Sequence, residues 1–97
     1  MALINFQGKL TMLRVHDVGT KFGPPTDQID AEVVFILNTH PDSAFGFKLR
    51  SDGNALAHRG MLGLLQSAFD HDWTVSNDAE VPTGKKNGIS IRVWLSR

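Results

Sequence analysis

Two short clusters in the sequence hold side chains that could bind a metal ion or transfer a proton. His16 precedes Asp17, and His71 lies between Asp70 and Asp72. Imidazole and carboxylate groups are common metal ligands and general bases. Neither cluster has the spacing of a zinc motif or of an acidic calcium loop. We therefore expect no metal site, and we expect the second cluster to be a solvated helix end.

The remaining nucleophilic groups form no catalytic motif. No serine lies in a Gly-x-Ser-x-Gly sequence, and cysteine is absent, which excludes disulfides, thiolate metal sites and a cysteine nucleophile. The glycines at residues 60–63 and 84–88 fit a helix interior and a hairpin turn better than a phosphate-binding loop. The sequence therefore predicts a non-enzymatic protein with no catalytic residue and no cofactor.

Three cations and one tryptophan could bind a nucleic acid. Lys48 and Arg50 share the outward face of an expected strand at residues 44–50, and Arg92 lies near Trp94 on another expected strand. Cations that neutralise phosphates, beside an aromatic ring on which a base stacks, are typical of single-strand nucleic-acid binding. These four residues are one candidate site.

Apolar residues on outward strand faces favour an interface instead. An expected strand at residues 30–38 is apolar on both faces, so Val34 and Ile36 would meet water unless the loop 19–28 or the N-terminal segment covers them. Met12 and Trp94 add apolar groups outside. Exposed apolar patches on small domains often mark protein contacts. We predict a homo-oligomer whose interface contains these four residues.

Alternating apolar residues predict the elements that position these side chains. Residues 1–8 form a short entry segment, and strands are expected at residues 9–18, 30–38, 44–50, 73–81 and 89–96. The alternation fades at Asn77 and Asp78, which predicts a bulge or a frayed edge. The loop 19–28 is long and contains two prolines, and loops of this kind often carry function.

One helix is expected at residues 52–71, between the third and fourth strands. Its apolar stripe consists of Ala57, Met61, Leu64, Leu65 and Ala68. Gly60 and Gly63 weaken the helix, and we expect them to allow close packing of another backbone.

The resulting order, β-β-β-α-β-β, resembles the OB-fold, a five-stranded barrel. The resemblance implies a mainly β fold with one helix, and a ligand surface on the second and third strands and the loops beside them. An open α+β sheet with one helix packed across it has the same element order and is the alternative. At 97 residues, the chain is expected to form a single domain, residues 1–97.

The composition narrows the function classes further. Lys plus Arg and Asp plus Glu each number 10, with no basic or acidic tail, which argues against strong non-specific nucleic-acid binding. No apolar stretch is long enough for a membrane span, so no membrane partner is expected. A secreted domain of this size usually has disulfides, so a cytoplasmic location is favoured, although a signal peptide could have been removed. We expect a self-associating OB-like binding or assembly module; the alternatives are a single-stranded nucleic-acid binder and a glycan or small-ligand binder that uses the loop 19–28.

Overall fold

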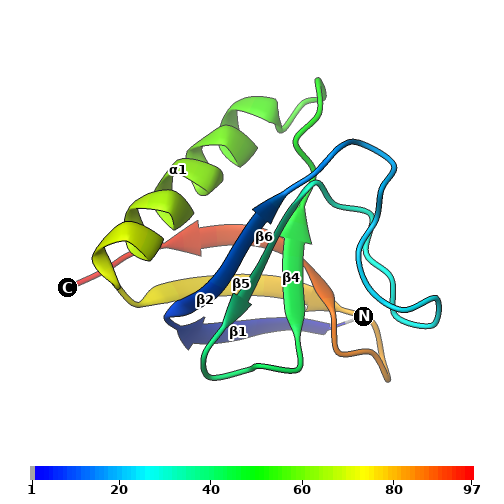
Figure 1. Cartoon of the computed structure of the whole chain (residues 1–97), viewed down its shortest axis with the longest axis horizontal. Coiled ribbons are helices and arrows are strands. Elements are labelled where there is room, and N and C mark those ends of the chain that lie inside the picture. Colours follow the sequence, from blue (N-terminus) through cyan, green and yellow to red (C-terminus); the bar gives the residue numbers. More distant parts are fainter. Residues whose placement is uncertain (1) are drawn as a thin grey trace.

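The computed structural model describes residues 2–97 as a six-stranded mixed sheet with one helix packed across one end (Figure 1). The elements are β1 (Ala2–Gly8), β2 (Leu10–Val15), β3 (Val33–Leu37), β4 (Ala44–Phe47), α1 (Ala55–His71), β5 (Val75–Val81) and β6 (Gly88–Trp94). The strand order is β1-β5-β6-β4-β3-β2; β4 and β6 are parallel, and the other neighbours are antiparallel. No helix within residues 2–97 has the length and apolar character needed to cross a membrane.

The two edges of the sheet are consecutive pieces of chain. β1 and β2 lie at opposite edges, yet only Lys9 separates them. The chain bends at Gly8, where a Cβ would lie 2.6 Å from Thr39 Oγ1 and 2.8 Å from Asn38 Oδ1. The turn between β3 and β4, which contains Asn38 and Thr39, holds this bend in place. Lys9 N donates to Asn38 Oδ1, and Thr39 Oγ1 donates to the Gln7 carbonyl.

The hydrogen-bonded sheet is not closed into a barrel, so the expected five-stranded barrel is not confirmed and the open α+β alternative fits. The sheet has a sixth strand because residues 2–8, expected to be an entry segment, pair with β5 along their whole length.

The main core lies between the inner face of the sheet and α1. Its largest fully buried side chains are Phe35, Phe45, Phe47, Leu37 and Leu65. From the predicted helical stripe, Met61, Leu65 and Ala68 are buried, whereas Ala57 and Leu64 are exposed. Because the sheet curls around only part of the helix, the buried stripe is narrower than the apolar one.

The expectation that Gly60 and Gly63 allow close packing is wrong. Both glycines are exposed, and a Cβ at either position would have no neighbour within 4 Å. They lie on the solvent side of α1, where they only lower its intrinsic stability.

A second apolar cluster lies on the outer face of β3 and β4, under the long loop that connects β2 to β3. Ile29 and Ala31 of this loop pack on Val34, which is 0% exposed. Val34 therefore does not meet water, because the loop covers it, which is one of the alternatives that the sequence left open. Gly46 allows this packing, since a Cβ there would lie 2.6 Å from the Val33 carbonyl oxygen and 2.8 Å from Ala31 Cβ.

A bulge changes which side chains of β6 face inward. Asp78 pairs with Arg92 while Ala79 pairs with Ser90, so Ile91 is an extra residue in the ladder. The predicted irregularity near Asp78 is confirmed. The alternation expected for β6 is broken, because Ser90 is buried at 1% exposure and Ile91 is 40% exposed. Only the residues after the bulge keep the expected orientation, with Val93 buried.

Candidate functional site

Arg50 ties the base of the long loop to the end of β4. Its Nε donates to Glu32 Oε1 at 2.9 Å, and its Nη2 donates to Glu32 Oε2 at 2.7 Å and to Asp30 Oδ1 at 2.6 Å. The amide of Leu49 donates to Glu32 Oε1 as well, at 2.9 Å. Glu32 is almost fully buried, so its charge depends on these donors.

The protonation of this cluster is shifted toward the charged forms. The Arg50 hydrogen bond lowers the pKa of Glu32, against the opposing effect of burial, and the Leu49 amide adds to the lowering. The Arg50 hydrogen bond also lowers the pKa of Asp30, and the two carboxylates raise the pKa of Arg50. The cluster is therefore a fully ionised structural anchor.

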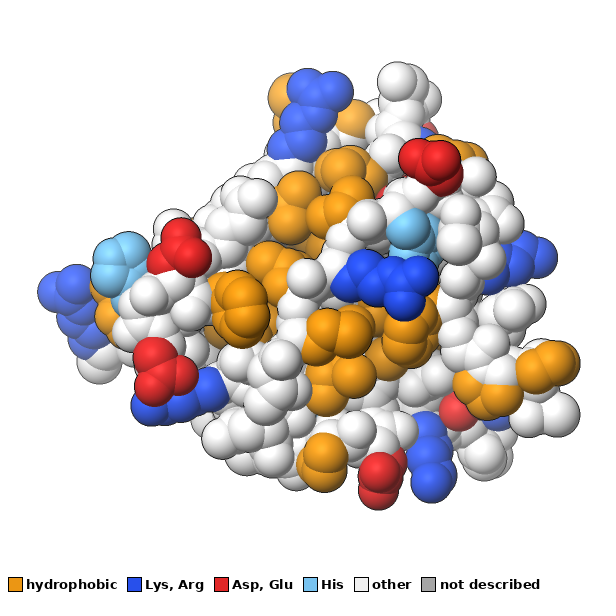
Figure 2. All heavy atoms as spheres, in the orientation of Figure 1, with side chains coloured by type: hydrophobic (Ala, Val, Ile, Leu, Met, Phe, Trp, Pro, Cys, Tyr) orange, Lys and Arg blue, Asp and Glu red, His pale blue; other side chains and the backbone are white. Residues whose placement is uncertain are grey.

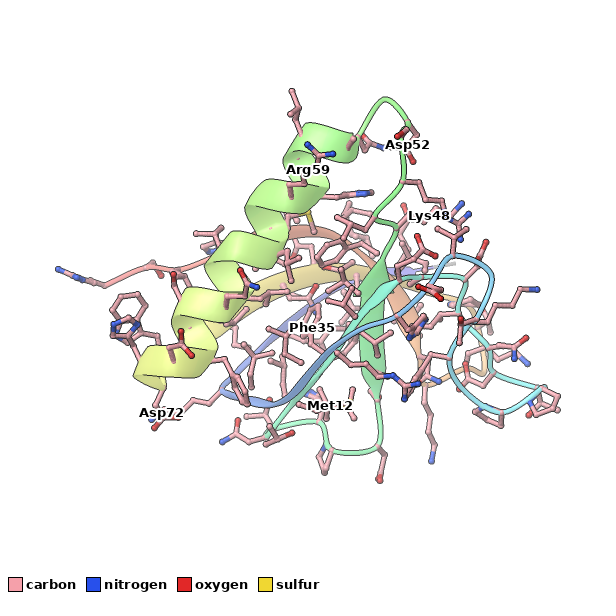
Figure 3. The ribbon with its side chains drawn as sticks, turned by 45° about the horizontal axis from the view of Figure 1, so that its top comes forward. Met12, Phe35, Lys48, Asp52, Arg59 and Asp72 are labelled. Carbon is pink, nitrogen blue, oxygen red and sulfur yellow. The ribbon has the colours of Figure 1, made fainter. Side chains whose placement is uncertain are left out.

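The four residues predicted for nucleic-acid binding do not form one cationic surface. Arg50 is held by two carboxylates, and Arg92 Nε lies 3.2 Å from Asp78 Oδ2. Lys48 has no carboxylate partner within residues 2–97 and lies just beyond the end of β4, outside the core (Figure 3). Trp94 is partly exposed, at 36%, on the far end of β6.

The four predicted interface residues do not form one patch either. Met12 pairs with Ile36, and both are partly buried at the outer face of β2 and β3, whereas Val34 is covered. Trp94 lies five residues beyond the position where β6 meets β4, which is roughly 17 Å along the strand. Figure 2 shows apolar side chains over β2, β3 and β4 and along the border with α1, interrupted by a cation. Whether this face contacts a second copy stays a prediction.

The two histidine–aspartate clusters have structural roles in this fold. His16 Nε2 donates to the Ala31 carbonyl at 2.7 Å and so holds the long loop. His71 Nδ1 donates to the Ser67 carbonyl, and Asp72 ends α1 with a φ of 57°. The second cluster is exposed, as expected for a solvated helix end. Within residues 2–97, no group of three or more His, Cys, Asp or Glu side chains is placed to hold a metal ion.

The long loop and the β5–β6 hairpin are locked together through Asp27 and Asn87. Asp27 Oδ2 accepts from the Lys86 amide at 2.8 Å, and the Asp27 carbonyl accepts from Asn87 Nδ2 at 2.9 Å. Asn87 Oδ1 accepts from the Ala44 amide at 2.8 Å, which connects the hairpin to β4. Lys85 Nζ donates to the Thr26 carbonyl. Asn87 is buried, and both its Oδ1 and its Nδ2 make hydrogen bonds, so the relative positions of the two loops are fixed.

A cleft of about 420 Å³ lies between these two loops, and we call it the loop cleft. It is lined by Pro25, Thr26, Asp27, Gln28, Ile29, Asp30, Lys48, Glu80, Pro82, Lys85, Asn87, Gly88 and Ile89. Ile89 forms part of its floor, since it pairs with Gly46 of β4 on one side and with Glu80 of β5 on the other. Among the charged side chains of the lining, Asp27, Asp30 and Lys85 are hydrogen-bonded or ion-paired, whereas those of Lys48 and Glu80 have no such partner within residues 2–97.

A second hollow of about 460 Å³ continues from the loop cleft toward the start of α1. The two hollows share Lys48 and Ile89. The second one has an apolar wall that includes Met61 and Ile91, together with His58, whose Nδ1 is buried without a partner. The site is therefore a groove with a polar half between the loops and a more apolar half beside the helix, joined at Lys48.

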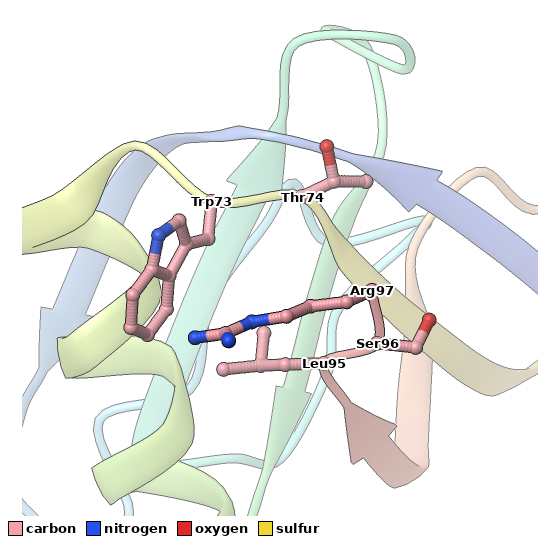
Figure 4. Close-up of a pocket in the computed structure, with 5 residues that line it drawn as sticks. All are labelled: Trp73, Thr74, Leu95, Ser96 and Arg97. Atoms are coloured by element: carbon pink, nitrogen blue, oxygen red, sulfur yellow. The ribbon is translucent and has the colours of Figure 1, made fainter.

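A third hollow, of about 350 Å³, lies at the opposite end of the helix (Figure 4). It is lined by Trp73, Thr74, Leu95, Ser96 and Arg97. The ring of Trp73 stacks on His71 with centroids 4.4 Å apart, and the Arg97 side chain extends between Leu95 and Trp73. No buried polar group of residues 2–97 lines this hollow, so it offers less specific chemistry than the loop cleft.

The sequence pointed to the loop 19–28 as a whole and to Lys48, but it did not single out Asp27 within that loop, nor Glu80 or Asn87 elsewhere. Aspartate and asparagine in loops are ordinary turn residues, so nothing in the local sequence distinguishes them as cross-links between loops. Comparison of the chain with protein-family models, with curated proteins and with solved structures gives no match.

Proposed function

We propose that the protein is a non-enzymatic binding module whose ligand is a small polar molecule held in the loop cleft. The observation that supports this most is the pair of charged side chains, Lys48 and Glu80, left without partners within residues 2–97 in a cleft whose other charged side chains are hydrogen-bonded or ion-paired. Fixing the walls before a ligand arrives lowers the entropic cost of binding. Binding of a small ligand beside the loop 19–28 is one of the alternatives that the sequence left open.

The chain topology is consistent with this location. We propose that β1 and β2 act as one strand bent at Gly8, which makes the strand order that of a five-stranded OB-like barrel. In such barrels the loops between strands one and two and between strands four and five bind the ligand. Here those loops are residues 16–32 and 82–87, and the loop cleft lies between them.

The free charges define the ligand. Lys48 would donate to a carboxylate or phosphate group, and Glu80 would accept from an ammonium, amide or hydroxyl group. Charge-assisted hydrogen bonds are worth about 1.5–3 kcal/mol each, so loss of either one weakens binding by about tenfold or more. A ligand with both an anionic group and hydrogen-bond donors, of which a free amino acid is the simplest, fits this pair.

The test is a titration followed by amide NMR, with a panel of free amino acids, dipeptides and simple sugars. Binding should shift the amides of residues 25–30, 48 and 80–89 and leave those of β1 unchanged. Lys48→Ala and Glu80→Gln should each weaken the interaction, whereas Lys86→Ala should not, because Lys86 lies on the same hairpin but does not line the cleft. Shifts scattered over the chain, or an equal effect of Lys86→Ala, would contradict the proposal.

A single-stranded nucleic acid is a weaker candidate ligand, since two of its three predicted cations are paired with carboxylates. Self-association through Met12, Val34, Ile36 and Trp94 also loses support, because Val34 is covered and Trp94 lies apart. A cytoplasmic location stays a prediction.

A further inference from the structure

The two edge strands of the sheet differ in how well they are protected. β2 contains the charged Arg14, has an irregular register between Leu10 and Met12, and lies beside α1. The Arg14 guanidinium lies 5.5 Å from the centre of the Phe22 ring, so the long loop covers part of this edge. Charges, bulges and covering segments are the usual means by which proteins prevent an edge strand from pairing with another chain.

Within residues 2–97, β1 is covered only at its Gln7 end, where the Thr39 hydroxyl contacts the strand. Its seven residues contain no charged side chain and no proline, and its register with β5 is unbroken from Ala2 to Gly8. Leu3 and Ile4 are 52% and 41% exposed, and they point to opposite faces of the strand. A long, regular and uncharged edge of this kind is a template for strand addition.

The free hydrogen-bonding groups of β1 can be assigned from one contact. The Gln7 carbonyl accepts from the Thr39 hydroxyl, outside the ladder with β5. Backbone groups of alternate residues point to the same side of an antiparallel strand, so those of Leu3 and Asn5 also point away from β5. Thr39 occupies the Gln7 end of the edge. Within residues 2–97, this leaves the outward backbone groups of Leu3 and Asn5 free to pair with another strand.

We propose that the protein forms a two-fold symmetric dimer in which β1 pairs antiparallel with β1 of a second copy. A two-fold axis through Ile4 places Leu3 of each copy opposite Asn5 of the other. The outward amide and carbonyl groups of both residues are then paired in both copies. The two Ile4 side chains then meet on the axis. A second copy is the occupant because the strand is uncharged and this register is self-complementary, so that no like charges on β1 face each other.

Sedimentation equilibrium over a concentration series tests the dimer. The wild type should approach twice the monomer mass as its concentration rises. Leu3→Pro removes an amide that points away from β5. Proline is tolerated at such a position of an edge strand, so the monomer should stay folded. The dimer should lose two hydrogen bonds, one from each copy. Ile4→Lys places like charges opposite each other across the axis. Each variant should raise the dissociation constant by about tenfold or more.

Val15→Lys is the matched control, because Val15 is also 52% exposed but lies on the protected edge strand β2. Its dissociation constant should stay within about twofold of the wild-type value. A monomer mass at every concentration would overturn the proposal. An equal loss of dimer in Val15→Lys, or a dimer unchanged in Leu3→Pro, would also overturn it. These outcomes do not depend on whether the loop cleft binds a ligand, since β1 does not line that cleft.

Discussion

Replacement of Gly46 by alanine tests whether the long loop is packed on the sheet as tightly as the loop cleft requires. The new Cβ would lie 2.6 Å from the Val33 carbonyl oxygen, 2.8 Å from Ala31 Cβ and 3.1 Å from Ile29 Cδ1. The first neighbour is backbone and the second is a methyl group fixed to backbone, so neither can rotate away. The loop or the neighbouring strand must move by several tenths of an ångström.

The expected cost follows from this geometry. Overpacking of a well-packed core costs about 1–3 kcal/mol, and we expect the upper end because backbone must move. For a domain of this length, about 3 kcal/mol corresponds to a fall in Tm of about 15 °C. Gly60→Ala is the matched control, since the same methyl group meets nothing within 4 Å on the exposed side of α1. It should stabilise the protein by about 0.5–1 kcal/mol.

Urea unfolding followed by circular dichroism measures both changes. Gly46→Ala should lower the midpoint, Gly60→Ala should raise it, and the slope should stay constant if the unfolded ensemble is unaffected. Adding Ala31→Gly to Gly46→Ala removes one of the two tightest contacts and should restore part of the stability. A Gly46→Ala protein with the wild-type midpoint would refute the reasoning, because it would mean that the loop is not in close contact with β4.

Three other outcomes are expected. Arg50 lowers the pKa of Glu32 below its ordinary value of 4.5, so the pairing stabilises the fold at neutral pH, and this contribution disappears as the pH falls through the lowered pKa. Glu32→Gln should therefore reduce stability at about pH 7 and flatten its decline toward about pH 3, as measured by urea unfolding; an unchanged pH profile would contradict the anchor. Asn87→Ala leaves the Ala44 amide without its acceptor, at about 1–3 kcal/mol, and should speed hydrogen exchange in residues 25–29 and at Ala44 by about tenfold; unchanged exchange would mean that the loops are held by other contacts. Binding of a labelled oligonucleotide, if detected, should have a slope of log affinity against log salt no steeper than about −0.7, because Lys48 alone among the predicted cations has no carboxylate partner within residues 2–97. Lys48→Ala should abolish this slope, and a slope of about −2 would show that Arg50 and Arg92 also contact phosphate.

Local patterns were enough to predict the parts of the fold that depend on neighbouring residues. The alternation of Phe45 and Phe47 with Gly46 predicted the inward face of β4, and the helical stripe predicted α1 to within three residues of its start. Long-range pairing could not be predicted in this way. Residues 2–8 looked like an entry segment because their partner strand, β5, lies far along the chain.

The candidate site was only partly predictable for the same reason. Whether Val34 is exposed could not be decided from the sequence, because its cover, Ile29 and Ala31, belongs to a loop whose path the sequence does not reveal. Strict alternation over residues 89–96 would turn Ile91 inward, but a bulge that depends on the register with Ala79 on another strand turns it outward. Arg50 looked free to bind phosphate, because its hydrogen bond with Glu32 forms only when the loop has folded.

The pairing of β1 with β5 also determines the order in which the protein can fold. Asn5 and Asp78 are hydrogen-bonded across 73 positions of sequence, so β1 has no partner strand until β5 has been synthesised. Contacts of such separation slow folding, because a large loop must close before they form. Until then the uncharged strand β1 has two open edges instead of one. During synthesis the chain is therefore open to misassociation at β1 for as long as β5 is missing.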